Sequence, residues 1–391
     1  MIRGLWGRAS FFVLVLVILG VSASRILARV HGPCANCHTM HNSQNGELVS
    51  SVGPYQHLTN KDCVGCHSND GSVTIVSLGE TRIPIVLNSA PPAYPSDGSP
   101  SGTLAGGNFY WVEQVGDEYG HNVINPDATL AWAPGGTSKF GVVPNSCGFE
   151  GCHKSLASIR YGPGPGPLFN PIRGNGCIGC HDAAHHANDE RFMLGNGYKF
   201  VDESGGGYRF INKAGARFWN IPPHNPPAVA GIEDPDWEQT VSPSDHNEYE
   251  DYPKPFAPLA YGGQAQGISD FCAGCHNAFH SWPEGGWPNG GDGNPWLRHP
   301  SGVVLPNRGE YAQYTVYNPL APVARPDAEA LQGQGGPLSE VRPGEDKVMC
   351  LSCHRAHGSP YPDMLRWDYT TCEAGSGNEE CGCFVCHTSK K

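Results

Sequence analysis

The sequence predicts a protein that is mostly coil, with short helices and few short strands folded around groups other than side chains. Three observations predict this class. The chain has 52 Gly and 35 Pro among 391 residues, and only 39% of its residues are hydrophobic, which argues against a large conventional core. No long stretch keeps a sustained helical period. Fourteen of the 16 cysteines fall into pairs that are followed immediately by histidine.

These pairs have the attachment signature of c-type haem, in which two thiols form thioethers to the porphyrin and the next histidine ligates iron. Six have the spacing CxxCH, and the third, CGFEGCH, has four residues between its thiols. A zinc or redox pair would explain one motif but not seven. The motifs are Cys34/Cys37/His38, Cys63/Cys66/His67, Cys147/Cys152/His153, Cys177/Cys180/His181, Cys272/Cys275/His276, Cys350/Cys353/His354 and Cys383/Cys386/His387.

The sequence therefore predicts seven covalently attached haem c groups, and these complete the fold class. We expect a multihaem cytochrome c, mostly coil with short helices and few short strands, wrapped around a chain of seven haems. The alternative at Cys147/Cys152 is a disulfide or a metal clip beside His153. The runs SVTIVSLG and RIPIVL are expected as strands, and the Gly- and Pro-rich segments between motifs as loops.

The N-terminus has the features of a secretory signal. Arg3 and Arg8 precede the apolar run FFVLVLVILG, and Val21 to Ala23 are small residues of the kind that signal peptidase accepts. The run is shorter than a membrane span of about 20 residues, so an uncleaved anchor is the weaker alternative. We expect a signal peptide over residues 1–23 and a single heptahaem domain over residues 24–391.

Charge and export limit the possible functions. Without residues 1–23 the net charge is −14 before the haem propionates are counted, which excludes a nucleic-acid binder. Attachment of c-type haem outside the cytoplasm agrees with export. The expected location is extracellular or at the cell surface, with the periplasm as the alternative.

Two cysteines lie outside the haem motifs. Cys372 and Cys381 are expected to form a structural disulfide that closes the loop EAGSGNEE. The alternative pairs Cys381 with Cys386 in a second long-spaced motif and leaves Cys383 without a role. Between the fourth and fifth motifs, the acidic run SPSDHNEYEDYP is expected to be a solvated loop rather than a calcium site.

The histidine count predicts how the irons are ligated. With only five methionines in the chain, bis-histidine ligation is expected at all seven irons, and ordinary surface histidines account for the rest. The histidines left after the seven proximal ligands are His31, His41, His57, His121, His185, His186, His224, His246, His280, His299 and His357.

Several of these histidines closely follow a proximal ligand. In CHTMH, His41 lies three residues after His38, and residues so spaced on a helix share one face. His41 therefore cannot reach the opposite face of its own iron, and it ligates a different haem or none. The segments CHRAH, CHNAFH and CHDAAHH repeat the pattern, the last with His185 and His186. Each segment can hold two irons close together, so a succession of them links haems into a chain.

Longer motifs resemble a known family, the OmcS-type extracellular multihaem cytochromes, which polymerise into conductive filaments. The resemblance runs in the same order over most of the chain and is weakest from about residue 190 to 260. The segments that carry it are GPCANCHTMHNS, GGNFYWVEQ followed by GHNVI and APGG, GISDFCAGCHNAFHS with WLRHPSG, and MCLSCHRAHGSPYPDMLRWDYTT.

The resemblance implies specific ligands. His121, His280, His299 and His357 would be distal ligands, and His41 would ligate a haem of the neighbouring subunit. This chain also departs from the family pattern, which has six haems, because CGFEGCH adds a seventh. Ala184 stands where the family has a histidine, so that His185 or His186 must substitute. The remaining distal candidates are His31, His57, His224 and His246.

Three functions follow. The first is an extracellular electron-transfer filament that passes electrons to minerals or other extracellular acceptors, with copies of itself and redox partner cytochromes as partners. The second is a monomeric periplasmic or surface carrier in which His41 ligates within its own chain. The third is a multihaem reductase, which needs an iron with an open position, whereas every motif here ends in histidine. No bond-making chemistry is implied by the first two.

Overall fold

A computed structural model describes the chain in segments. The described residues are 30, 32–51, 53, 55, 58–94, 102–123, 177, 180–181, 183, 185–186, 192–202, 207–211, 229–251, 267–273, 299–326 and 333–391. The expected signal peptide lies outside them. None of the helices in these ranges has the length and apolar character needed to cross a membrane.

Regular structure is short throughout these ranges, as the composition predicts. The α-helices are α2 (Cys63–His67), α3 (Tyr110–Gln114), α5 (Ile268–Ala273) and α7 (Cys383–Cys386). The 3-10 helices are η1 (Cys34–Asn36), η3 (Asp117–Tyr119), η6 (Gly195–Gly197), η8 (Tyr208–Phe210), η12 (Gly309–Gln313), η13 (Cys350–Ser352), η14 (Pro362–Met364), η15 (Tyr369–Thr371) and η16 (Thr388–Lys390). Coil connects them.

The strands are equally short and form small separate sheets. They are β1 (Ser43–Gln44), β2 (Glu47–Leu48), β3 (Ser68–Asn69), β4 (Ile75–Leu78), β5 (Thr81–Pro84), β6 (Leu87–Asn88), β7 (Lys199–Val201), β8 (Gly231–Glu233), β9 (Glu248–Tyr249), β10 (Val303–Val304) and β11 (Lys347–Val348). Antiparallel pairing joins β1 to β2, β4 to β5 and β10 to β11, and β7, β8 and β9 form a three-stranded sheet. Strands β3 and β6 pair in parallel.

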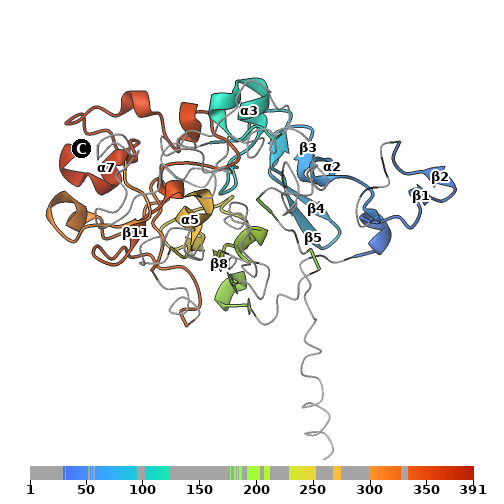
Figure 1. Ribbon diagram of the computed structural model, residues 1–391, viewed down its shortest axis with the longest axis horizontal. Coiled ribbons are helices and arrows are strands. Elements are labelled where there is room, and N and C mark those ends of the chain that lie inside the picture. Colours follow the sequence, from blue (N-terminus) through green and yellow to red (C-terminus); the bar gives the residue numbers. More distant parts are fainter. Residues whose placement is uncertain are drawn as a thin grey trace, which may run out of the picture.

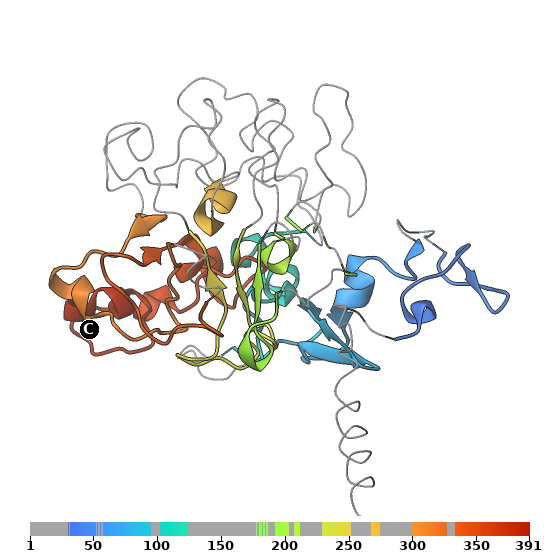
Figure 2. The same ribbon diagram turned by 90° about the horizontal axis from the view of Figure 1, so that it is seen from below.

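The chain advances along the long axis of the molecule (Figure 1). The hairpin of β1 and β2 protrudes at one end, and α7 with the C-terminus lies at the other, in both views (Figures 1 and 2). The turn between β1 and β2 is Asn45-Gly46, and both residues have positive φ, as a tight hairpin turn with these residues requires.

The two expected strands are confirmed in part. Strands β4 and β5 pair antiparallel from Ile75 opposite Pro84 to Leu78 opposite Thr81. The run RIPIVL does not form one strand, because proline cannot donate to the ladder, and β5 ends at Pro84. The chain resumes pairing at β6, which lies beside β3 next to the second haem motif.

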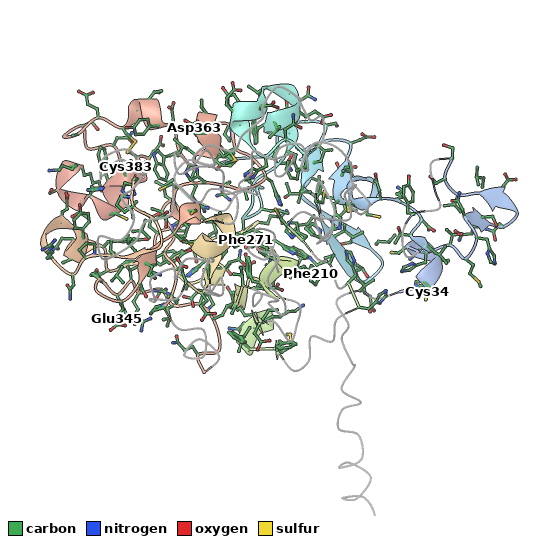
Figure 3. The ribbon with its side chains drawn as sticks, in the orientation of Figure 1. Cys34, Phe210, Phe271, Glu345, Asp363 and Cys383 are labelled. Carbon is green, nitrogen blue, oxygen red and sulfur yellow. A yellow bond between two sulfur atoms is a disulfide. The ribbon has the colours of Figure 1, made fainter. Side chains whose placement is uncertain are left out.

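Small apolar clusters replace a single core, and cysteines of the haem motifs lie at their edges. Cys177 packs against Phe109, Val112 and Val123. Cys386 packs against the cluster around Tyr317 and Val348. In Figure 3, side chains fill the molecule along its length, from Cys34 at one end to Cys383 near the other, with Phe210 and Phe271 between them. Cysteines of different haem motifs therefore lie at the edges of different apolar clusters.

Candidate haem-binding sites

Each described haem motif folds as one tight helical turn. The backbone N–H of the motif histidine donates to the carbonyl of the first cysteine at 2.8 Å in the first motif, 2.9 Å in the fourth and seventh and 3.1 Å in the sixth. In α2, Asp62 caps the turn by accepting from the Gly65 N–H at 2.6 Å. A single turn places two thiols and an imidazole on one side of the chain, as a c-type attachment requires.

The thiols are available for attachment. Eleven cysteines of the motifs lie in the described ranges, and all carry free thiols: Cys34, Cys37, Cys63, Cys66, Cys177, Cys180, Cys272, Cys350, Cys353, Cys383 and Cys386. Burial raises the pKa of Cys353 and Cys386 to about 12. These thiols are therefore uncharged at neutral pH before they form thioethers to haem.

The described motifs lie next to one another in chain order. A hydrogen bond with Cys63 and then burial raise the pKa of Cys177, which places the second motif beside the fourth. Burial and then the Cys37 thiol raise the pKa of Cys66, which places the first motif beside the second.

The same relationship continues toward the C-terminus. A hydrogen bond with Cys350, burial and the more distant Cys180 raise the pKa of Cys272, so the fifth motif lies between the fourth and the sixth. Burial and then the nearby Cys386 thiol raise the pKa of Cys353, which places the sixth motif beside the seventh. The described thiols thus form one continuous series from the first motif to the last.

Most of the described candidate histidines have a fixed ring orientation. His67 Nδ1 lies 2.8 Å from Pro84 O, and His181 Nδ1 lies 2.9 Å from Arg209 O. The corresponding contacts of the other four are His121 with Ala356 O at 2.7 Å, His299 with Pro300 O at 2.9 Å, His354 with Asp363 O at 2.7 Å and His387 with Glu310 Oε1 at 3.1 Å. Donation from Nδ1 leaves the Nε2 lone pair for a metal.

Imidazoles from distant segments also face one another in pairs. The ring centres are 5.9 Å apart for His38 and His186, 6.2 Å for His67 and His185, 6.0 Å for His181 and His357, and 6.2 Å for His299 and His387. Each pair contains one motif histidine and one histidine outside the motifs. The pairing of His181 with His357 joins the fourth motif to the segment that follows the sixth.

These separations fit a bis-histidine iron. A metal–imidazole bond is about 2 Å long, and the ring centre lies roughly 1 Å beyond the nitrogen, so the ring centres of two ligands on opposite sides of an iron are about 6 Å apart. The free thiols, the oriented Nδ1 atoms and the ring separations therefore all fit c-type haem.

His357 is held neutral, which is the form that binds a metal. Burial, together with the nearby imidazoles of His181 and His121, lowers the pKa of His357 to about 3. Its ring lies 4.7 Å from that of Phe109. Its backbone N–H donates to Gly106 O at 2.7 Å, and the backbones of Gly107 and Gly358 form a bridge. The GGN segment that precedes α3 thus fixes the position of His357.

Two further candidates have very different environments. His41 is exposed, close to the hairpin of β1 and β2. His246 is fully buried, its ring stacks on Tyr317 at 3.5 Å, and its Nδ1 lies 3.2 Å from Ser242 O. His246 Nε2 lies 3.7 Å from Glu248 Oε1. These contacts indicate a structural role for His246 rather than the ligand role that the sequence left open.

The expectation of a solvated acidic loop is wrong. In the run SPSDHNEYEDYP, Glu248 is 0% exposed and Asp251 is 2% exposed. Glu248 Oε1 accepts from Nε and Nη2 of Arg325 at 3.0 and 2.8 Å, and Arg325 also contacts Asp346. No local sequence pattern predicts this cluster, because its charges come from three segments that are far apart in the chain.

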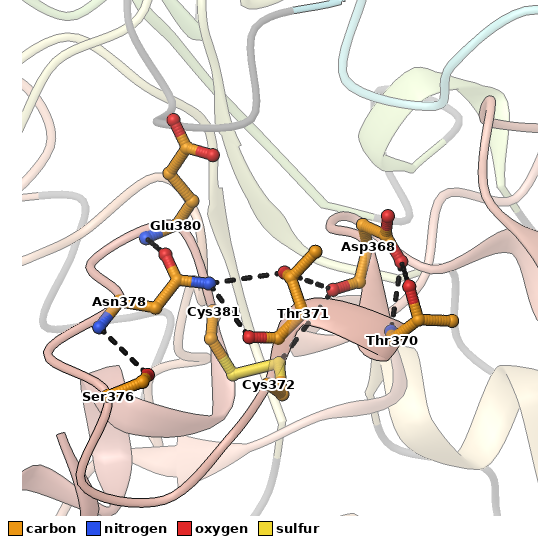
Figure 4. Close-up of a disulfide and its surroundings, with 8 residues drawn as sticks. All are labelled: Asp368, Thr370, Thr371, Cys372, Ser376, Asn378, Glu380 and Cys381. Atoms are coloured by element: carbon orange, nitrogen blue, oxygen red, sulfur yellow. Dashed lines mark hydrogen bonds between the residues drawn. A yellow bond between two sulfur atoms is a disulfide. The ribbon is translucent and has the colours of Figure 1, made fainter.

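The disulfide prediction is confirmed. Cys372 and Cys381 are bonded (Figure 4), so the alternative pairing of Cys381 with Cys386 in a haem motif is wrong. Asn378 holds the closed loop by donating from Nδ2 to Thr371 O at 3.0 Å and accepting from the Glu380 N–H at 3.0 Å. The Cys383 thiol lies within 4.8 Å of the disulfide sulfurs and is free to hold haem.

Some candidates lie outside the described residues. They are the whole third motif, Cys147, Cys152 and His153, part of the fifth motif, Cys275 and His276, and the histidines His31, His57, His224 and His280. Their assignments stay predictions.

Comparison with known proteins agrees with this site. A family model described as a doubled CXXCH motif matches residues 342–391. The chain is 28% identical over 407 residues to the C-type cytochrome OmcS of Geobacter sulfurreducens, with 88% of this chain and 82% of that protein covered. A solved structure of the outer membrane cytochrome S filament from Geobacter sulfurreducens matches with a TM-score of 0.50 and 19% identity, covering 90% of this chain and 88% of that one. A second structure, of OmcS nanowires from the same organism, matches with a TM-score of 0.43.

The free thiols, the facing imidazoles and the doubled motif define the class of the protein: a c-type cytochrome with several covalently attached haems. Within that class the chain is similar in sequence to the C-type cytochrome OmcS and in fold to the solved cytochrome S filament subunit. The resemblance that the sequence motifs carry is thereby confirmed.

Proposed function

We propose that this protein is an extracellular electron conduit that carries seven bis-histidine haems and polymerises head to tail into a filament. The solved relative is described as a filament, which supports the proposal. The seven motifs of the sequence supply the haem count. The expected location is outside the cell, and the expected partners are copies of the same chain, redox partner cytochromes, and minerals or other extracellular electron acceptors.

The series of motifs supports conduction along the molecule. The thiols of neighbouring motifs lie side by side from Cys37 and Cys66 to Cys353 and Cys386. Haems attached to such thiols would be close neighbours, and multistep electron hopping needs close spacing. Because the chain advances along the long axis, the haem series would connect the two ends of the molecule (Figure 1).

The protein's residues set the conditions for transfer. When bound, c-type haem supplies a centre that gains and loses one electron. The motif thiols would hold the haem, and the facing imidazoles would supply two nitrogen ligands to its iron, which would leave no open site for a substrate. Carbonyls such as Pro84 O and Arg209 O orient the rings of His67 and His181. Ligation and ring orientation then change little between oxidation states.

The observation that carries the filament proposal is the position of His41. It is exposed at the protruding N-terminal end, where Met40 and Leu48 are 76% and 66% exposed. An exposed metal ligand beside exposed apolar side chains is suited to contact with another subunit. His387 directly follows α7, which lies at the opposite end (Figure 1), and its ring faces that of His299 and contacts Glu310 of η12.

A bond from His41 to an iron of the next copy joins two different surfaces. Such a head-to-tail contact does not close on itself and produces an open filament. The mature chain carries a net charge of −14, so copies repel one another unless a specific bond overcomes the repulsion. An axial iron–imidazole bond supplies that specificity.

The proposal is tested by replacing His41. The haem-loaded wild type, His41→Ala and the control Glu47→Ala, which alters an exposed residue of β2, are compared by negative-stain electron microscopy and electron paramagnetic resonance. We expect filaments and low-spin haem for the wild type and Glu47→Ala. We expect single particles with about one high-spin iron per chain for His41→Ala, because one axial position is vacated.

Other results would favour the alternative functions. Filaments from His41→Ala with fully low-spin haem would rule out the proposed joint. Single wild-type particles with only low-spin haem would favour the monomeric carrier. A high-spin iron in the wild type that binds nitrite or a sulfur oxyanion would favour the reductase.

A further inference from the structure

His185 and His186 are adjacent in the sequence but face different haem motifs. The ring of His185 lies 6.2 Å from that of His67, with 21° between the ring planes. The ring of His186 lies 5.9 Å from that of His38, with 26° between the planes. One dipeptide therefore reaches the proximal histidines of both the first and the second motif.

The two separations agree with the geometry of a shared iron. Two imidazoles that bind one iron from opposite sides have ring centres about 6 Å apart. The His67 ring is oriented by Pro84 O, so its Nε2 is the metal-binding atom. The ring of His185 also contacts Phe210 at 6.0 Å, and the neighbouring Arg209 O orients His181. Residues of η8 thus contact both His181 and His185.

We propose that His185 is the distal ligand of the haem attached at Cys63/Cys66, and that His186 is the distal ligand of the haem attached at Cys34/Cys37. This inference rests on the haem loading assumed in the proposed function. Two consecutive residues then bind two different irons, and His181, four residues before His185, binds a third. The segment from His181 to His186 would tie three consecutive haems of the described series together.

The contacts between the first two motifs are consistent with this assignment. The Asn60 backbone N–H donates to Cys37 O at 2.8 Å, and Asn60 Nδ2 donates to Ala35 O at 3.0 Å. His38 and Thr59 form a backbone bridge. These contacts hold the first motif against the segment that leads into α2, so one dipeptide can span both irons.

The assignment also explains a difference between motifs of this chain. The segments CHTMH and CHRAH have one histidine three residues after the proximal ligand, whereas CHDAAHH has Ala184 at that position and histidines at the next two. A single histidine at position 184 would bind one iron. Adjacent histidines that lie near different motif histidines would bind two.

The test uses the full haem-loaded protein and measures iron spin state rather than activity. The variants are His185→Ala, His186→Ala, the double variant, and the control Ala183→Ser in the same segment. Intact mass counts the haems, which stay attached through their thioethers. High-spin ferric haem is quantified by electron paramagnetic resonance, and added imidazole is used for rescue.

We expect about one high-spin iron per chain for each single variant, two for the double variant and none for the control, with imidazole restoring the low-spin signal. Electron cryo-microscopy of each single variant should show the loss of ligand density at the second haem for His185→Ala and at the first for His186→Ala. One high-spin iron in the double variant, or a single variant that stays fully low-spin, would overturn the assignment.

A second pair of variants keeps the test decisive if the alanine variants fail to fold. His185→Met and His186→Met each keep a ligand, and each should give one Met/His haem with a raised reduction potential. An unchanged set of potentials would again overturn the assignment. Filament formation by the wild type is measured separately. If the wild type forms single particles but the variants give the expected spectra, only the proposed filament is rejected and the ligand assignment stands.

Discussion

Glu310 accepts a hydrogen bond from Nδ1 of His387 at 3.1 Å, so a carboxylate orients the proximal imidazole of the last haem motif. In the hydrogen bonds described above, His67, His121, His181, His299 and His354 contact backbone carbonyls instead. Hydrogen bonds from Ser389 and His387 lower the pKa of Glu310, so it is ionised at neutral pH. A carboxylate partner makes the ligand more basic and stabilises oxidised iron.

The variant Glu310→Gln should therefore raise the reduction potential of the last haem. The amide oxygen still accepts the hydrogen bond, but the negative charge is lost. We expect a shift on the order of tens of millivolts, where about 59 mV is a tenfold change for one electron. Spectroelectrochemical titration should show one component move upward and the others stay. The exposed Glu340→Gln is the control, and an unchanged titration for Glu310→Gln would contradict the role.

Gly107 should tolerate no side chain, because its backbone lies against the segment that carries His357. Its φ is +81°, and an added Cβ would overlap the Gly358 carbonyl. Gly375 has a φ of +82° and open space around the Cβ position, so it is a matched control. We expect Gly375→Ala to cost about 1–2 kcal/mol of unfolding free energy. Gly107→Ala should cost roughly 2 kcal/mol or more beyond that.

Thermal unfolding and iron spin state measure the two effects together. Gly107→Ala should also displace His357 and give a high-spin iron, whereas Gly375→Ala should not. Equal losses of stability for both variants, with low-spin iron in each, would show that the backbone contact does not position His357.

Arg325 should be needed for stability, because it is fully buried between two acidic groups. Burial would raise the pKa of Glu248, but His246, whose Nε2 lies 3.7 Å from Glu248 Oε1, and the Arg325 guanidinium lower it. Arg325→Met removes the guanidinium that lies between the buried Glu248 and Asp346 carboxylates and should cost about 3–5 kcal/mol. Arg342→Met removes a partly exposed partner of the same Asp346 and should cost about 1 kcal/mol or less. Denaturant unfolding measures both, and similar losses would contradict the burial argument.

Asp234 should make stability depend on pH. Burial and a hydrogen bond with Asp236 raise its pKa to about 8. Asp234 Oδ1 accepts from the N–H groups of Asp236 and Glu238 at 2.7 and 3.1 Å, and its Oδ2 is buried without a hydrogen-bond partner among the described residues. The folded state therefore favours the neutral carboxyl.

The sign of the effect follows from the raised pKa. Below about pH 4 the carboxyl is protonated in both states, and between about pH 4 and 8 only the unfolded state releases its proton readily, so stability falls as pH rises. Asp234→Asn keeps the Oδ1 acceptor and removes this dependence. Its stability advantage over the wild type should grow by roughly 1–3 kcal/mol from pH 5 to 8, as measured by urea unfolding. A constant difference would contradict the raised pKa.

The chemistry of the site could be read from the sequence, since cysteine and histidine spacing is local. Each CxxCH turn whose residues are all described is closed by hydrogen bonds within five residues, and the disulfide of Cys372 and Cys381 closes a short loop. The low hydrophobic content correctly predicted short elements and small apolar clusters. In each case the pattern and its structural consequence lie in the same short segment.

Long-range relationships could not be predicted in this way. The sequence indicated that His185 or His186 is a substitute ligand. It could not show that each histidine lies near a different motif, because that depends on how distant segments pack. Burial of Glu248 depends on Arg325, which is 77 residues away in the sequence. The acidic run by itself therefore predicts a solvated loop. Local composition carries no information about a partner so distant in the chain.

The most direct measurement is electron cryo-microscopy of the secreted, haem-loaded wild-type protein at low concentration. The conduit proposal predicts filaments in which seven haems per subunit form a continuous series and density joins His41 to an iron of the adjacent copy. It also predicts that the haems of the first, second, fourth, fifth, sixth and seventh motifs follow in that order. Compact single particles, with His41 bound to an iron of its own chain or to none, would contradict the filament.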